Sequence, residues 1–165
     1  MLSAETASGK YPREAVCMMA KIVAEAEGNL AEFMQTRRRS HSRLSISETI
    51  CESIAHAAQD LDMAAIAVFT ETGNTARMLS KFRPKSQIYA FSHVAAVCNR
   101  MNLLWGVQSV RRDHALNSEE MLATAEQELL RSGRVKAGDV LGVVAGTQMS
   151  SGSTNFMRLH VVKGG

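Results

Sequence analysis

The chain has 165 residues and a formal net charge of only +3, so its length suits one domain with a sizeable core and its charge does not favour a nucleic-acid partner. No run of about 18 apolar residues is present, so we expect no membrane partner, and residues 1–12 lack the apolar stretch of a secretory signal. The three cysteines lie far apart in the sequence, which favours small buried hydrophobes over a disulfide framework or a zinc site and fits a cytoplasmic location.

A helical pattern occupies the first part of the chain. Pro12 suits the first turn of a helix, apolar residues follow at helical spacing, and Gly28 is placed to end it. Residues 30–34 could form a short second helix. The basic and polar stretch 36–42 is expected to be an exposed loop, because such runs of charge are usually solvated.

The next helix is expected to begin with Ser45 or Ser47 as its cap and to continue to Leu61. Glu48 stands three residues after Ser45, which is the spacing of a capping box. Apolar residues at helical spacing supply the buried face. His56 lies beside this face and has no second ligand four residues later, so we expect a packed or surface histidine rather than a metal ligand.

Residues 64–76 are the most informative stretch, with a strand, a small polar turn and the start of a helix. The apolar run 64–69 is typical of a buried strand. The turn supplies hydroxyls, one residue free to adopt a positive φ, and an asparagine that tolerates the same region; its residues are Thr70, Glu71, Thr72, Gly73, Asn74 and Thr75. Backbone N–H groups at such a junction meet the positive end of the helix dipole, which favours a bound phosphate.

The turn is not a Walker loop, because it has one glycine and no Lys-Ser/Thr pair after it. A simple helix cap formed by Thr72 or Asn74 is the plainer alternative to phosphate binding.

Strands and helices alternate through the rest of the chain. We expect helices at 76–82, 94–101 and 118–131, and strands at 87–92, 104–107, 140–145 and 157–162. This alternation predicts an α/β fold with three layers, α/β/α, around a mixed, mostly parallel five-stranded sheet whose last strand is an antiparallel edge. Ligands of such sheets lie beyond the carboxyl ends of the strands. The turn 70–75 and the loop 146–154 both leave strands there, so they can meet over one ligand.

Four segments, in the same order, resemble the C-terminal part of pyruvate kinase. They are MLSAETA with GKYP and EAV at 1–16, TETGNTA with KFRP at 70–84, GDV at 138–140, and GSTN with MR at 152–158. The resemblance covers essentially the whole chain but only the C-terminal domain of that enzyme. It implies that residues 1–12 are a remnant of the last strand and exit segment of the catalytic barrel, and that residues 13–165 are the C-terminal domain.

The resemblance implies catalysis by a parent enzyme rather than by this chain. The family transfers phosphate from phosphoenolpyruvate to ADP in glycolysis with magnesium and potassium, and its catalytic residues lie in the barrel. Nothing here corresponds to them, and no carboxylate pair has metal-site spacing. We therefore expect no catalytic residue, no metal site and no cofactor in this chain.

The resemblance also implies an effector site. In the family this domain binds an allosteric effector, often a sugar bisphosphate, and takes part in a tetramer interface. By this resemblance the phosphate ligands are Thr70, Thr72, Gly73, Asn74 and Thr75, and the loop that closes over the sugar includes Gly146, Ser151, Gly152, Ser153 and Thr154. Expected partners are a phosphorylated effector, the catalytic barrel of the parent enzyme and further copies of the chain.

One departure from the family concerns the second phosphate. Animal-type members carry an arginine for it in the helix region where this chain has Ser118 to Ala125, a stretch without arginine in which Met121 is the nearest position by spacing from Gly138. A sugar monophosphate or a nucleotide is therefore as credible a ligand as a bisphosphate.

Two other functions remain open. A purely structural or interface domain without an effector is favoured by the missing arginine. A free-standing enzyme needs a nucleophile–base pair, and Ser92 with His93 is a poor one, because neighbours along a strand point to opposite faces. Trp105 is a lone aromatic residue for which packing is a better explanation than base stacking.

Overall fold

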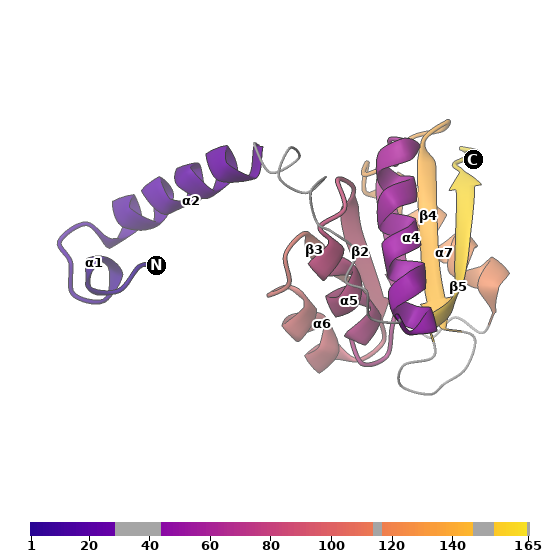
Figure 1. Cartoon of the computed structure of the whole chain (residues 1–165), viewed down its shortest axis with the longest axis horizontal. Coiled ribbons are helices and arrows are strands. Elements are labelled where there is room, and N and C mark those ends of the chain that lie inside the picture. Colours follow the sequence, from indigo (N-terminus) through magenta and orange to yellow (C-terminus); the bar gives the residue numbers. More distant parts are fainter. Residues whose placement is uncertain (29–43, 114–116, 147–153, 165) are drawn as a thin grey trace. The chain divides into compact units, whose positions relative to one another are not determined.

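The computed structural model describes residues 1–28, 44–113, 117–146 and 154–164 (Figure 1). The chain divides into two compact units, Met1–Ser42 and Arg43–Gly165, which are described here one at a time. The boundary between residues 12 and 13 that the resemblance implied concerns the domains of the parent enzyme and stays a prediction. The helix expected at 30–34 and the loop at 36–42 lie outside the described residues. In the described ranges, no helix has both the length and the apolar character needed to cross a membrane.

The first unit contains two helices, α1 (Ala4–Ala7) and α2 (Pro12–Gly28). Helix α2 has the bounds predicted from the proline and the glycine. Where the resemblance implied the end of a barrel strand, the segment holds α1 instead. None of the residues of α2 is buried, and its large apolar side chains Val16, Met18, Ile22 and Val23 are exposed.

The second unit is a three-layer α/β/α fold, as the alternation of elements predicted. Its elements in chain order are α4 (Ile46–Asp60), β1 (Ala65–Phe69), α5 (Asn74–Phe82), β2 (Gln87–Ser92), α6 (Ala95–Met101), β3 (Val107–Arg111), α7 (Ser118–Arg131), β4 (Val140–Gly146) and β5 (Thr154–Val161). The strand order is β3-β2-β1-β4-β5. The first four strands are parallel, and β5 is antiparallel to β4 at the edge.

Each face of the sheet carries its own apolar core. Helices α4, α5 and α6 pack on one face over residues such as Ile66 and Val68, and α7 packs on the other over Phe91 and Leu141. Side chains of this size contribute roughly 1.5–3 kcal/mol each when fully buried. Gly142 permits the close approach of α4 to β4, because a Cβ at this position would lie 2.9 Å from Cδ1 of Ile54.

Helix α4 begins with the capping box that the sequence predicted. The hydroxyl of Ser45 accepts a hydrogen bond from the backbone N–H of Glu48, and the Glu48 carboxylate accepts one from the backbone N–H of Ser45. The Glu48 carboxylate accepts hydrogen bonds from the backbone N–H of Ser45 and, as the smaller effect, from the Ser45 hydroxyl, and both lower the pKa of Glu48. The cap fixes the position at which the chain enters the second unit, and it leaves Ser47 within the helix.

The strand predicted at 104–107 is wrong, because β3 is Val107–Arg111. The apolar residues Leu104 and Trp105 lie in a turn that begins at Met101 and ends at Gly106, whose φ is +65°. The backbone carbonyl of Trp105 accepts a 2.7 Å hydrogen bond from the Ser80 hydroxyl. As an edge strand, β3 buries only its first residue, so its mostly polar sequence lacked a strand pattern.

The start of β5 also differs from the prediction. The sequence placed Thr154 and Asn155 in the loop and began the strand at Met157, whereas β5 begins at Thr154. Polar residues at this end do not alternate with apolar ones, so periodicity alone could not extend the strand. The antiparallel edge itself is confirmed.

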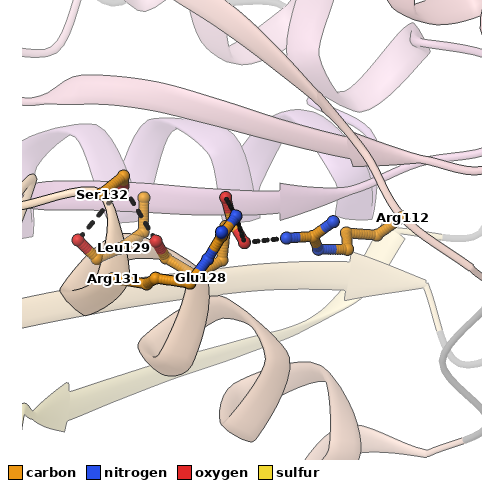
Figure 2. Close-up of polar contacts among 5 residues, drawn as sticks. All are labelled: Arg112, Glu128, Leu129, Arg131 and Ser132. Atoms are coloured by element: carbon orange, nitrogen blue, oxygen red, sulfur yellow. Dashed lines mark hydrogen bonds and ion pairs between the residues drawn. The ribbon is translucent and has the colours of Figure 1, made fainter.

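Ionic contacts fix helix α7 over the sheet. Figure 2 shows the Glu128 carboxylate between the guanidinium groups of Arg112, just after β3, and Arg131. Burial of the carboxylate opposes its ionisation, but the two arginines outweigh this effect and lower the pKa of Glu128. Across the helix, Glu119 pairs with Arg158 of β5, and Glu126 lies 3.1 Å from the ring of His160.

Candidate functional site

The turn between β1 and α5 has the backbone geometry that its composition predicted. Gly73 adopts φ +84° in the left-handed region and is the N-cap residue of α5. Neither Thr72 nor Asn74 is itself the N-cap residue, although the Thr72 hydroxyl bonds the N–H of Asn74, the first residue of α5. The positive φ favours glycine here, and a Cβ on Gly73 would also lie 3.2 Å from Cγ of Met101, so the methionine side chain would have to shift slightly to admit it.

Two hydroxyls of the turn act as acceptors for its own backbone. The hydroxyl oxygen of Thr70 accepts a 3.0 Å hydrogen bond from the N–H of Gly73, and that of Thr72 accepts a 3.4 Å bond from the N–H of Asn74. A hydroxyl that accepts in this way keeps its own proton for donation. The backbone N–H of Thr70 donates to the carbonyl of Phe91, which fastens the turn to β2.

The turn and the start of β5 meet as the sequence analysis expected. The hydroxyl oxygens of Thr75 and Thr154 lie 2.7 Å apart, and either can be the donor. Gly146, at the end of β4, pairs with Thr154 across a bulge in the β4–β5 ladder. Of the other predicted loop residues, Ser151, Gly152 and Ser153 lie outside the described residues.

A third hydroxyl joins this pair, and the sequence analysis did not identify it as a site residue. The Ser47 hydroxyl, in the first turn of α4, donates a 3.1 Å hydrogen bond to the backbone carbonyl of Thr154. Ser47, Thr75 and Thr154 are 8%, 6% and 3% exposed. The position of Ser47 near the start of a helix suggested only a cap. Its contact with Thr154 spans 107 positions, so no local sequence pattern could reveal it.

Positive charge near the turn comes from the helix and from two exposed side chains. The first N–H groups of α5 have no acceptors within the helix and lie at the positive end of its dipole. Arg77 and Lys81 follow on the same helix and are both exposed. A small anion placed at the turn would therefore meet hydroxyl donors, helix N–H groups and a weak positive field.

The position expected to supply a second cation carries none. Met121 lies in α7, whose only arginine, Arg131, is in the last turn. Arg158 reaches the first turn of α7 from β5, but its guanidinium is bonded to Glu119. Among the described residues, no group of three or more His, Cys, Asp and Glu side chains could hold a metal ion.

The sequence matches a known family over most of the second unit. The family described as pyruvate kinase, alpha/beta domain, matches residues 48–160. Among curated proteins, the chain is 41% identical over 164 residues to pyruvate kinase of Geobacillus stearothermophilus, covering 98% of this chain and 28% of that protein. It is 36% identical to pyruvate kinase of Lactococcus lactis subsp. lactis, covering 99% of this chain and 32% of that protein. It is 37% identical to pyruvate kinase of Clostridium acetobutylicum, covering 99% and 35%.

Proposed function

The chain belongs to the pyruvate kinase alpha/beta domain family, and from this premise we propose that it binds a phosphorylated effector for a longer pyruvate kinase. The chain spans about a third or less of the relatives it matches, 28% of the Geobacillus stearothermophilus protein for example. The parent activity is accordingly part of the proposal: phosphoryl transfer from phosphoenolpyruvate to ADP in the glycolysis of the cytoplasm.

The turn after β1 is the observation that carries the proposal. Gly73 is held at φ +84° as the N-cap residue of α5, and this turn presents the first N–H groups of the helix, at the positive end of its dipole, to a phosphate oxygen. The hydroxyls of Thr70 and Thr72 already accept from the backbone, which leaves their protons for donation to the phosphate. Asn74 would complete this group.

Thr75 and Thr154 can contribute one further donor. In a pair of hydroxyls, one proton is used in the bond between them, and the second proton is available to another acceptor. This donor would hold the ligand from the side of β5.

We propose a ligand with one phosphate, a sugar monophosphate or a nucleotide, ahead of a bisphosphate. The observation that favours this choice is that, within the described residues, α7 has no arginine near Met121 and the Arg158 guanidinium is paired with Glu119. A phosphate alone, held by hydroxyls, N–H groups and a helix dipole, is expected to bind in the millimolar range, which is about −4 kcal/mol.

The alternative is a structural domain that forms part of an oligomer and binds no effector. The exposed apolar side chains of α2, among them Val16 and Ile22, favour this function, because such side chains usually pack against a partner. The partner would be the catalytic barrel of the parent enzyme or a further copy of the chain.

In the described ranges no group of three or more His, Cys, Asp and Glu side chains could hold a magnesium ion, and we assign no step of phosphoryl transfer to these residues. In the proposed parent enzyme, the magnesium and potassium ions would be held elsewhere. Calorimetric titration with fructose 6-phosphate, AMP and fructose 1,6-bisphosphate tests the proposal. Comparable affinity for all three, or tighter binding of a monophosphate, supports it. Binding of the bisphosphate a hundredfold tighter than either monophosphate would contradict the single-phosphate site, and no heat from any of them would favour the structural domain.

A further inference from the structure

The three buried hydroxyls of Ser47, Thr75 and Thr154 connect three elements that are distant in the sequence. Ser47 lies in the first turn of α4, Thr75 in the first turn of α5, and Thr154 is the first residue of β5. The bonds run from the Ser47 hydroxyl to the Thr154 carbonyl at 3.1 Å, and between the Thr75 and Thr154 hydroxyls at 2.7 Å. One end of this chain of bonds is at the candidate phosphate turn, and the other is at the start of α4.

We propose that Ser47, Thr154 and Thr75 form a relay that transmits occupancy of the turn after β1 to the N-terminal end of α4. The proposal rests on the proposed phosphate site for its input. Its output is the N-terminal end of α4. This helix is the first element of the second unit in chain order, so it follows directly on the first unit in the sequence.

The direction of the shared proton gives the relay two states. Without a ligand, either Thr75 or Thr154 can donate to the other. When a phosphate accepts the proton of the Thr75 hydroxyl, that hydroxyl can only accept from Thr154, so the bond between them has one orientation. Successive hydrogen bonds polarise one another in a buried setting. The bond is therefore strengthened, and it draws the first residue of β5 toward α5.

The backbone carbonyl of Thr154 carries the change to α4. Ser47 donates to this carbonyl, and both residues are buried. Water therefore cannot replace the bond when Thr154 moves, and the first turn of α4 feels the movement. A third contact, a long one, runs from the Cys51 thiol to the Thr75 carbonyl at 3.9 Å and joins the next turn of α4 to the same residue. A fixed Thr154 thus holds the first turn of α4 more firmly, and a released one loosens it.

The ligand-free protein provides the first test. Thr75→Val should speed amide hydrogen exchange in residues 47–50 of α4 by roughly two- to tenfold, the factor expected for one buried hydrogen bond. Ser86→Ala is the matched control, because the Ser86 hydroxyl is also buried and donates a 2.7 Å bond to a backbone carbonyl, that of Met63. The control should leave residues 47–50 unchanged relative to the rest of the second unit. Equal effects of the two variants, or no effect of Thr75→Val, would overturn the relay.

Inorganic phosphate provides the second test. In the unaltered chain, phosphate should shift the amide resonances of residues 70–76 and slow exchange in residues 47–50. In Ser47→Ala, the shifts at 70–76 should persist while the response of α4 is lost. A response of residues 47–50 that survives unchanged in Ser47→Ala overturns the relay, because it would show that the Ser47–Thr154 bond does not carry the signal and that another contact, such as Cys51 with Thr75, does. If phosphate shifts no amide resonance at 70–76, the proposed effector site fails, and with it the transmission of its occupancy. The comparison of ligand-free Thr75→Val and Ser86→Ala then decides by itself whether Thr75 is linked to α4.

Discussion

The hydroxyl oxygens of Thr75 and Thr154 lie 2.7 Å apart although 79 positions separate them in the sequence. The contact joins the first turn of α5 to the start of β5 in a region where both residues are buried. The turn before α5 follows the carboxyl end of β1, and Thr154 pairs with Gly146 at the carboxyl end of β4. The geometry of the candidate site therefore depends on both strands.

Removing both of these hydroxyls should destabilise the fold by less than the sum of the two single removals. Thr75→Val or Thr154→Val alone should lower the free energy of unfolding by about 1–2 kcal/mol, because the remaining hydroxyl is left buried without its partner. The double variant should lose less than the sum, since two apolar groups can pack without an unsatisfied donor. Urea unfolding of the four proteins measures this. Strict additivity would show that the hydroxyls do not interact.

Valine at position 73 should damage both the fold and the site. Gly73→Val forces a branched side chain into the left-handed region and toward Met101, so we expect a loss of roughly 1–2 kcal/mol from the backbone alone and a further loss from the contact. Gly133→Val is the matched control, because Gly133 has φ +66° and nothing within 4 Å of the added Cβ. The control should lose only the roughly 1–2 kcal/mol of unfolding free energy that comes from the backbone conformation, and it should still bind phosphate. Phosphate binding by Gly73→Val at unchanged affinity would contradict the site.

The sequence predicted the features that depend on local pattern and on fold topology. The positive φ of Gly73, the Ser45 capping box and the contact of Thr75 with Thr154 at one edge of the sheet agree with what turn chemistry, cap spacing and strand direction predict. The sequence could not identify Ser47, since a single serine near a helix start has the same pattern whether or not a distant carbonyl lies beside it. Strand β3 was misplaced because an edge strand needs few apolar residues.

Neutralising Glu128 should loosen α7. Glu128→Gln removes the ion pairs with Arg112 and Arg131, and because the glutamate side chain is only 14% exposed we expect a loss of up to about 1 kcal/mol of unfolding free energy. Asp62→Asn is the control, since its pair with Lys85 is fully exposed to solvent, and its melting temperature should not change.

The same carboxylate predicts a pH dependence. The pKa of Glu128 is lower in the folded chain than its ordinary value of 4.5, so its contribution is present above pH 4.5 and is lost as the pH falls through the folded value. Melting temperatures measured from pH 7 down to the acid transition should fall more steeply for the unaltered chain than for Glu128→Gln. Parallel curves would contradict the assignment.

The cysteines should differ in reactivity. Cys17 is exposed, whereas Cys51 is fully buried, and burial, followed by the nearby charge of Glu48, raises the pKa of the Cys51 thiol from 9.0 to about 12. Iodoacetamide at pH 8 should therefore modify Cys17 in the folded chain and reach Cys51 only after unfolding. Because the folded pKa is raised, the contribution of Cys51 to stability is complete below pH 9 and is lost between pH 9 and about 12. Mass spectrometry of peptides from native and unfolded samples decides the first point, and equal labelling of the two thiols in the native sample would contradict it.

Phosphate binding at the turn after β1 is most directly tested by an NMR titration of the full 165-residue chain. Amide resonances are followed while inorganic phosphate and then a sugar monophosphate are added, with sodium chloride at equal ionic strength as the control. We predict that the strongest shifts fall on residues 70–77 and 146–155, with half-saturation near millimolar phosphate, which corresponds to about −4 kcal/mol. Shifts that fall mainly outside these residues, or no shift in the millimolar range, would contradict the site.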